Sequence, residues 1–340
     1  MSIRVLEHTP AGLRRAVEAL GERGYRADQI IDWVYAKACS DPQKMTNLPD
    51  ALAGHITVLT SHVVARAASR DGTVKLLLEL GDGERVECVG IPARQRVTAC
   101  VSTQAGCAQG CTFCATGLDG LQRNLTAGEI LEQVLNLTDA GGRRVTNVVF
   151  MGAGEPLANY DATVSAVRAL IDSERFGISA RSVTVSTVGL PGAIRRLAGE
   201  DLPITLAISL HAPNDALRRE LMPAAPPLDD VLAAAATFYA RRKREVTLEY
   251  VLLAGVNDST LCAKGLARLA KRLRCNVNLI RYNPVAGVAY ARPSEAAARA
   301  FLARLRRQGV NAHLRRSRGR DADAACGQLR RRPASHRQRT

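Results

Sequence analysis

The chain has 340 residues, of which 46% are apolar and 23% charged, which is typical of a globular protein with one large α/β domain and a smaller one. Residues 1–11 contain no apolar signal core and no later stretch reaches membrane-spanning length, which argues against an exported or membrane protein and predicts a cytoplasmic one. The net charge of +15 favours a polyanionic partner such as nucleic acid, and only 4% aromatic residues disfavour a stacking platform for single strands.

The first 92 residues divide into two small units. Residues 1–60 are predicted to form an N-terminal helical domain, because two segments have amphipathic spacing and an Asn-Leu-Pro sequence opens a third helix: 13–20, 29–38 and 47–49. Residues 61–92 are predicted to form a short antiparallel β extension of three strands. Two Asp-Gly pairs, at 71–72 and 82–83, mark its turns.

Between residues 93 and 315 the pattern alternates between strand and helix. Strands are predicted at 97–102, 145–151, 183–186, 204–210, 247–253 and 276–282. Helices are predicted at 126–139, 162–172, 191–197, 228–241, 261–274 and 294–308. Six such units predict parallel strands with helices outside them, as in an incomplete (β/α)6 barrel, with the chemistry at the carboxyl ends of the strands.

Cys107, Cys111 and Cys114 form a C-x3-C-x2-C run after the first of these strands. Three thiolates this close can hold three corners of a cubane iron–sulfur cluster, and the fourth iron is then left open, whereas an electron-transfer cluster normally takes four cysteines. Structural zinc usually takes four ligands in paired knuckles, and the nearest histidine in the sequence is His62. The run therefore predicts an iron–sulfur cluster that can bind a substrate or cofactor directly.

Polar motifs follow four later strands. They are Gly152-Ala-Gly-Glu155, Ser186-Thr-Val-Gly189, Ser209-Leu-His-Ala-Pro-Asn214 and Tyr282-Asn283-Pro284. Each alone could be a helix cap or a turn, and a lone histidine such as His211 is more often structural. Four such motifs at successive strand ends predict one ligand-lined rim, on which small residues let the backbone approach the ligand.

Several of these motifs together resemble the radical S-adenosylmethionine (SAM) RNA adenine methyltransferases of the RlmN/Cfr family. The likeness runs from about Gly21 to about Leu329. It rests on the three-cysteine run, Arg123-Asn-Leu-Thr-Ala-Gly-Glu129, Gly154-Glu-Pro156, the Ser209–Asn214 segment and Asp323-Ala-Ala-Cys326-Gly-Gln-Leu329. The cysteine run alone indicates only the radical SAM superfamily, and the last segment is far more specific. The fold implied is the incomplete (β/α)6 radical SAM barrel.

The resemblance implies the cofactors and their ligands. Cys107, Cys111 and Cys114 would hold a [4Fe-4S] cluster whose open iron chelates SAM. The SAM contacts implied are Gly154, Glu155, Ser186, Ser209, Leu210, His211 and Asn283. The electron would come from a donor such as flavodoxin or ferredoxin, and the protein is expected to be a monomer.

The resemblance also implies three catalytic roles. Cys326 would carry the methyl group, Cys100 would form a transient disulfide with Cys326, and Glu87 would accept the ring proton. A thiolate can take a methyl group from SAM, whereas an electron-poor adenine carbon cannot. Two SAM molecules would be used per turnover, one to methylate Cys326 and one to generate the radical that activates its methyl group. The expected substrate is an adenosine in 23S rRNA, with a tRNA adenosine as a second candidate, and the same residues serve attack at C2 or C8.

Plainer interpretations stand beside these roles. Glu87 could be a solvated charge on a strand edge, and Cys100 could be an inert core cysteine. Residues 316–340, which carry Cys326 and a basic tail, contain arginines that could bind RNA or have no role. The chain could be a different radical SAM enzyme, or an RNA-binding protein in which a cluster or zinc is only structural.

Overall fold

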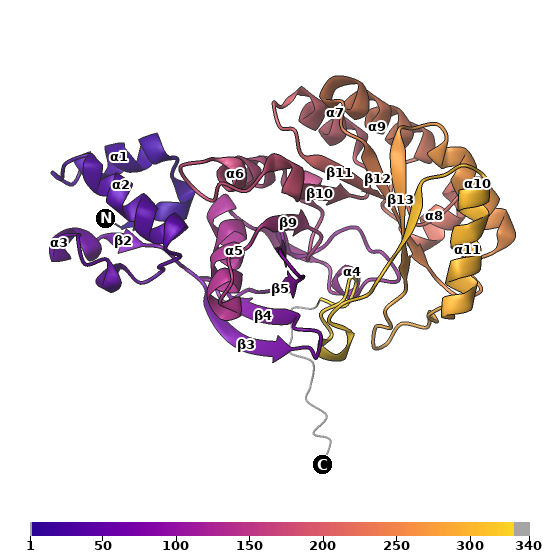
Figure 1. The fold of residues 1–340 in the computed structure, drawn as a ribbon, viewed down its shortest axis with the longest axis horizontal. Coiled ribbons are helices and arrows are strands. Elements are labelled where there is room, and N and C mark those ends of the chain that lie inside the picture. Colours follow the sequence, from indigo (N-terminus) through magenta and orange to yellow (C-terminus); the bar gives the residue numbers. More distant parts are fainter. Residues whose placement is uncertain (1, 330–340) are drawn as a thin grey trace, which may run out of the picture.

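A ten-stranded mixed sheet forms the centre of the computed structural model, which describes residues 2–329 (Figure 1). Its strands, in spatial order, are β14 (Ala312–Arg315), β13 (Cys275–Arg281), β12 (Val246–Leu252), β11 (Thr205–Ser209), β10 (Val183–Thr187), β9 (Asn147–Phe150), β6 (Val97–Cys100), β5 (Arg85–Pro92), β4 (Val74–Glu79) and β3 (His62–Ala68). Neighbours from β6 to β14 run parallel, and β3, β4 and β5 are antiparallel.

The six strands expected between residues 97 and 282 are confirmed as β6, β9, β10, β11, β12 and β13. The sheet contains a seventh parallel strand, β14, which the six-unit prediction lacked because its sequence, Ala-His-Leu-Arg, is short and only half apolar. The three antiparallel strands of the extension are also present. Since β5 pairs with β6, they continue the same sheet.

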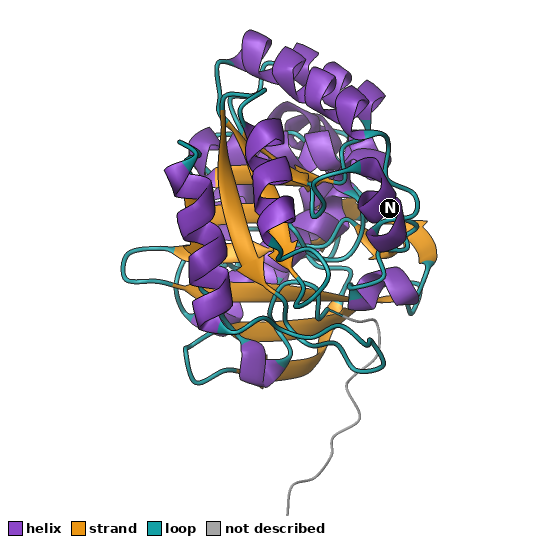
Figure 2. Ribbon diagram, turned by 90° about the vertical axis from the view of Figure 1, so that its right-hand side faces the viewer, coloured by secondary structure: helices purple, strands orange, loops and turns teal. Residues whose placement is uncertain are grey.

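Helices lie along the outside of the parallel strands (Figure 2). The long ones are α5 (Ala127–Gly141), α6 (Tyr160–Ile171), α7 (Pro191–Gly199), α9 (Leu228–Arg242), α10 (Thr260–Ala270) and α11 (Glu295–Arg307). A shorter helix, α8 (Asp215–Leu221), follows β11. Because helices cover the parallel strands, apolar runs such as Leu248-Glu-Tyr-Val-Leu252 are almost completely buried.

The N-terminal unit is helical, as expected, and packs on the same core as the sheet. It contains β1 (Ile3–Arg4), α1 (Pro10–Glu18), α2 (Tyr25–Ile31), a π-helical turn (Asp32–Ala36), α3 (Asp50–Ala53) and β2 (Ile56–Thr57). The short parallel pair of β1 and β2 was not predicted. No helix in residues 2–329 combines the length and apolar character that a membrane span requires.

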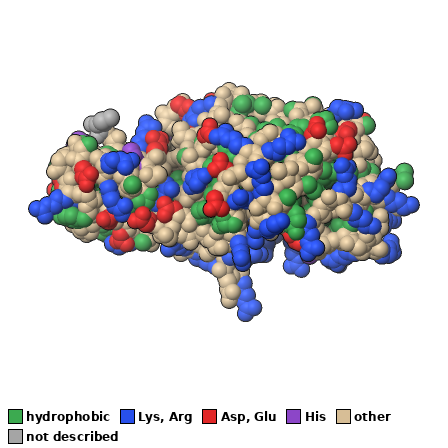
Figure 3. Space-filling view, turned by 90° about the horizontal axis from the view of Figure 1, so that it is seen from above, with side chains coloured by type: hydrophobic (Ala, Val, Ile, Leu, Met, Phe, Trp, Pro, Cys, Tyr) green, Lys and Arg blue, Asp and Glu red, His purple; other side chains and the backbone are tan. Residues whose placement is uncertain are grey.

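Basic side chains are spread over one whole face of the molecule, interleaved with acidic and apolar ones (Figure 3). The predicted basic tail beyond Leu329 lies outside the described residues. On this face the basic side chains are distributed and do not gather in one patch.

Candidate active site

The cluster loop, residues 107–120, is closed at its base by a small antiparallel ribbon. The ribbon consists of β7 (Gln104–Gly106) and β8 (Leu121–Asn124). The amide of Cys107 donates to the carbonyl of Gly120 over 2.9 Å. Gly106 has a φ of +82°, and a Cβ added there would lie 1.8 Å from the Gly120 oxygen. Only glycine therefore permits this closure of the loop.

The three cysteines of the loop are half-buried and line one cavity of about 170 Å³. Burial raises the pKa of Cys107 to about 11 and also raises that of Cys111 above its ordinary value. Such thiols are poor nucleophiles, but coordination to a metal deprotonates them. Within residues 2–329 no three His, Cys, Asp or Glu side chains converge as ligands of a single ion do. A cubane spreads its thiolates over separate irons, so a soft three-thiol set fits an iron–sulfur cluster.

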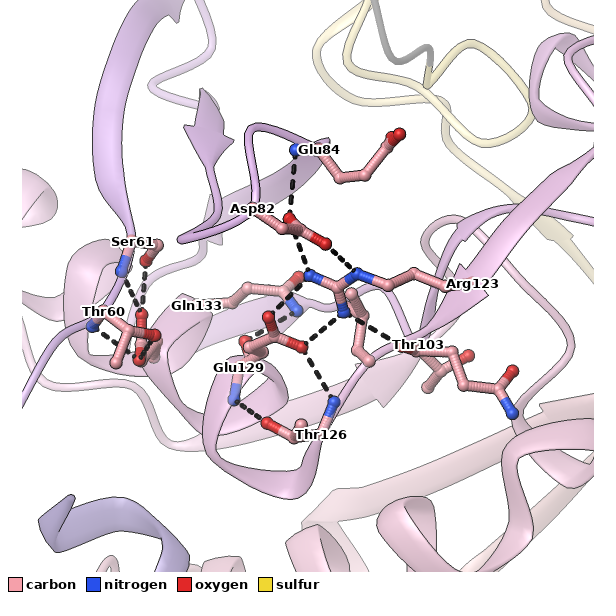
Figure 4. Close-up of polar contacts among 12 residues, drawn as sticks. Thr60, Ser61, Asp82, Glu84, Thr103, Arg123, Thr126, Glu129 and Gln133 are labelled. Carbon is pink, nitrogen blue, oxygen red and sulfur yellow. Dashed lines mark hydrogen bonds and ion pairs between the residues drawn. The ribbon is translucent and has the colours of Figure 1, made fainter.

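Arg123, at the end of the ribbon, fixes the loop to the rest of the sheet (Figure 4). Its guanidinium donates to both carboxylate oxygens of Glu129 over 2.8 Å each, and to both of Asp82 in the β4–β5 turn. Glu129 also accepts from the amide of Thr126, whose hydroxyl accepts from the amide of Glu129, which forms a capping box at the start of α5. The Arg123–Glu129 motif thus has a structural role beside the site.

Replacing Arg123 with methionine is expected to lower the free energy of unfolding by about 2 kcal/mol, because two carboxylates lose charge-assisted hydrogen bonds. Urea unfolding at neutral pH measures the loss. Arg123 holds the pKa of Asp82 down at about 2, so this contribution is present above about pH 4 and disappears as the pH falls through 2. Arg299→Met, which breaks an exposed pair with Glu295, should cost much less, because water screens that pair; equal losses would contradict the prediction.

Gly154 and Glu155, which follow β9, line the same cavity as the cysteines. Gly154 has a φ of +101°, and an added Cβ would lie 2.6 Å from the Cβ of Gln104. The buried Glu155 carboxylate accepts from the amides of Leu157 (2.9 Å) and Val188 (2.8 Å). Burial raises the pKa of Glu155. The carboxylate thus joins two strand-end loops and retains lone pairs for a ligand.

Ser186, Ser209 and His211 line the cavity from the next two strands. The Ser186 and Ser209 hydroxyl oxygens are 3.5 Å apart. The Nδ1 atom of His211 accepts from the amide of Val251 over 3.0 Å, and its ring meets that of Phe113 edge to face. Burial lowers the pKa of His211 to about 3, so the imidazole is neutral near pH 7 and offers only Nε2–H to the cavity.

Leu210 and Asn283 lie differently from the other expected SAM contacts. The Leu210 side chain is fully buried in the main core and does not line the cavity. The Asn283 side chain donates to the carbonyl of Cys326 over 3.1 Å and accepts from Arg292 over 2.8 Å. The structure therefore places Asn283 beside the C-terminal segment.

The C-terminal segment brings Cys326 to the cluster loop. The carbonyl of Gly327 accepts from the amide of Ala115 (2.8 Å), and that of Leu329 accepts from the hydroxyl of Thr116 (2.9 Å). Ala115 and Thr116 begin α4 (Ala115–Leu118), directly after Cys114, and Figure 1 shows the yellow segment beside this helix. Cys326 consequently lines the same cavity as the three cysteines of the loop.

A second cavity, of about 210 Å³, adjoins the first and contains Cys100. The two cavities share Met151, Ile280, Arg315 and Cys326 in their walls. Cys100 is therefore more than core filling, since it lines a cavity together with Cys326. Burial raises the pKa of Cys100 to about 12, and Arg315 opposes this shift. The nine cysteines of the chain are all free thiols here.

Glu87 lies in β5, between β4 and β6, and is only 4% exposed. The alternative that it is a solvated charge on a strand edge is therefore wrong. Its carboxylate forms an ion pair of 2.9 Å with the ammonium of Lys75. Glu87 lies two residues before Val89, the partner of Cys100 across the sheet, and so on the same face as Cys100.

Two charged residues of the site were missed in the sequence. Glu249 lines the first cavity from β12; one of its carboxylate oxygens accepts from Asn278 (3.0 Å) and the other has no hydrogen-bond partner within residues 2–329. Burial raises the pKa of Glu249. Arg315 lines both cavities, and attraction to Cys326 raises its pKa. Glu249 had a signal, as the one charge in an apolar strand, whereas Arg315 ends the unrecognised β14.

The fold and site define a radical SAM protein. The family model described as "Radical SAM superfamily" matches residues 101–263. The crystal structure of HydG, a maturase of the [FeFe]-hydrogenase, shares the fold with a TM-score of 0.52 at 15% identity, covering 69% of this chain and 55% of HydG.

More specific comparisons identify the family. The model described as "Ribosomal RNA large subunit methyltransferase N-terminal domain" matches residues 3–59. A probable dual-specificity RNA methyltransferase RlmN from Thermosynechococcus vestitus is 47% identical over 96% of this chain and 98% of its own, and one from Thermus thermophilus is 46% identical over 92% and 90%. A radical SAM methyltransferase from Sphaerobacter thermophilus has a TM-score of 0.94 at 43% identity, covering 97% of this chain and all of that one. The chain belongs to the RlmN family of radical SAM methyltransferases.

Proposed function

We propose that the protein methylates a ring carbon, C2 or C8, of an RNA adenosine. The substrate is 23S rRNA, with tRNA as a second one, in keeping with the dual-specificity RNA methyltransferases that the chain resembles. One observation carries the proposal: Cys326 lies in the wall between a cavity that contains three cluster-type cysteines and a cavity that contains Cys100.

The first cavity suits the cofactors. Cys107, Cys111 and Cys114 would hold a [4Fe-4S] cluster, and the rim of Gly154, Glu155, Ser186, Ser209 and His211 would hold SAM, used twice per turnover. The cluster supplies the single electron that cleaves SAM. The chain itself supplies a thiol at Cys326 that accepts the methyl group, and a docked C-terminal segment that keeps this sulfur in the cavity wall. Leu210, through its backbone, and Asn283, beside Cys326, complete the proposed site.

The second cavity suits the RNA base. Cys100 and Cys326 lie in its wall, and the exposed Arg96 and Arg316 also line it. An adenosine stacked within folded RNA must leave its stack to reach an enclosed sulfur, and arginines can hold the flanking phosphates while it does so. This arrangement also agrees with the strongly basic composition of the chain.

Arg96→Ala and Arg316→Ala should each weaken RNA binding similarly for different sequences. Each should lower the slope of log affinity against log salt by roughly 1, because one phosphate contact is lost. Fluorescence anisotropy with labelled RNA, measured across a salt series, tests this. Arg307→Ala, on the exposed side of α11, is the matched control and should leave the slope unchanged. If all three variants have the same slope, Arg96 and Arg316 do not contact RNA phosphates.

Cys100→Ala should trap a covalent protein–RNA adduct, because Cys326 is then joined to the adenine and no neighbouring thiol remains to attack its sulfur. Denaturing gels of the variant incubated with SAM, reductant and RNA should show a band sensitive to ribonuclease. The rRNA of a deletion strain should lack one methyladenosine isomer. Mass spectrometry of that rRNA would show which isomer is missing and so identify the ring carbon. Normal turnover by Cys100→Ala, or unchanged rRNA in the deletion strain, would contradict the proposal.

We also propose an architecture, an electron donor, a cellular compartment and an oligomeric state for the protein. The parallel strands would form an incomplete barrel over residues 93–315, flanked by the helical domain (1–60), the β extension (61–92) and the C-terminal segment (316–340). The electron would come from a flavodoxin or ferredoxin, and the protein would act as a cytoplasmic monomer. The alternation of strands and helices along the chain, with neighbouring strands from β6 to β14 in parallel, supports the incomplete barrel.

A further inference from the structure

Lys75 on β4 contacts two residues, Glu87 and Asp323, that are far apart in the sequence. Its ammonium lies 2.9 Å from the carboxylate of Glu87 and donates to the carbonyl of Asp323 over 3.0 Å. The Lys75 side chain is 12% exposed and that of Glu87 is 4% exposed, so most of this contact is shielded from water. Asp323 lies three residues before Cys326. One ammonium thus contacts both the expected proton acceptor and the segment that carries the methyl-accepting sulfur.

The register of the sheet explains why Lys75, Glu87 and Cys100 lie on the same face. Lys75 pairs with Val89, and Val89 pairs with Cys100, so Lys75, Val89 and Cys100 share one face with Glu87. The other face carries Gly90, where an added Cβ would touch Leu137 of α5 at 3.3 Å. The Glu87 face is therefore free of α5, and the C-terminal segment covers it through Ala324 and Leu329, which pack with Val89 and Cys100.

Within residues 2–329, Lys75 supplies a cation in direct contact with Glu87. Cys88 on the same strand also interacts electrostatically with Glu87, Cys100 on β6 shares its face of the sheet, and the Asp323 carbonyl accepts from Lys75. Burial of a carboxylate favours its neutral form unless a cation and hydrogen bonds compensate. A neutral carboxylic acid cannot accept a proton. An ammonium in contact with Glu87 keeps the carboxylate ionised and ready to act as a base.

We propose that Lys75 is a positioning residue for methyl transfer: it keeps Glu87 ionised as the proton acceptor and ties Glu87 to the segment that carries Cys326. The inference rests on the proposed function, in which Glu87 takes the proton from the adenine carbon. In that step the C–H bond breaks, its electron pair stays with the ring, and the proton forms a new O–H bond on Glu87. Lys75 lines neither of the two cavities, so its role is to position Glu87.

The test separates the charge of Lys75 from its hydrogen bond. Lys75→Gln keeps a donor for the Asp323 carbonyl but removes the charge, and Lys75→Arg keeps both. The rate of RNA methylation is measured against pH for these variants and for Glu87→Gln, together with S-methylation of Cys326 by intact-protein mass spectrometry. Ser69→Ala is the matched control, since it removes another tie to the segment, the hydrogen bond to Asp321, without touching Glu87.

Lys75→Gln should methylate Cys326 normally, turn over RNA about 10²-fold more slowly near pH 7, and recover as the pH rises, because the acidic limb of its profile moves to higher pH. Lys75→Arg and Ser69→Ala should keep the wild-type limb. A wild-type limb in Lys75→Gln, or failure of its Cys326 to be methylated, would overturn the role of Lys75. Turnover by Glu87→Gln at the wild-type rate would instead overturn the proposed proton acceptor, so the two failures can be distinguished.

Discussion

Cys326→Ala should abolish RNA methylation, with a loss on the order of 10⁴-fold or more, because the variant has no sulfur in the wall that the two cavities share. The three cysteines of the cluster loop are untouched, and the backbone contacts of Gly327 and Leu329 with α4 do not involve the sulfur. We therefore expect wild-type iron and sulfide content after anaerobic reconstitution. Methylation is measured with labelled SAM and RNA.

Cys262→Ala is the matched control for this experiment. Cys262 lies on α10, is partly buried and lines neither cavity, so its loss should leave methylation unchanged. Measurable turnover by Cys326→Ala would show that the methyl group reaches RNA without this sulfur. The mechanism of methyl transfer through Cys326 would then be wrong, although the chain would still belong to the same family.

The parallel strands could be predicted because a strand that is buried on both faces has a nearly continuous run of apolar residues. Runs such as Val246–Leu252 are almost continuously apolar, and each is followed by a helix of the expected length. The strand β14 was not predicted because four residues with two apolar side chains form no periodic pattern. Its place in the sheet is set by pairing with β13 and by the packing of α11, which are tertiary contacts.

The candidate site was predictable where its chemistry is local. Three cysteines within one loop and polar residues at strand ends can be recognised without coordinates, and the structure brings Gly154, Glu155, Ser186, Ser209 and His211 around the cysteines. The burial of Glu87 could not be predicted in this way, because it depends on the register of β5 between β4 and β6. Lys75 and Arg315 acquire their roles only through contacts with residues far away in the sequence, so no local pattern pointed to them.

Gly106→Ala is expected to prevent formation of the cluster site. A methyl group at this position would overlap the carbonyl of Gly120, and alanine is strained at a φ of +82°. The ribbon at the base of the loop must then open, which moves Cys107 away from Cys111 and Cys114. We expect a loss of about 2–5 kcal/mol in the free energy of unfolding, from overpacking and left-handed strain together. Iron and sulfide content after reconstitution should fall close to zero.

Gly110→Ala separates strain from overlap within the same loop. Gly110 also has a positive φ, +62°, but an added Cβ meets no atom within 4 Å. It should cost only about 1–2 kcal/mol and keep its iron, because the left-handed strain is present without the clash. Should both variants lose the cluster equally, backbone strain in the loop would be the controlling factor. If both variants keep the cluster, the loop tolerates an open ribbon, and the pairing of β7 with β8 is not what holds Cys107 in place.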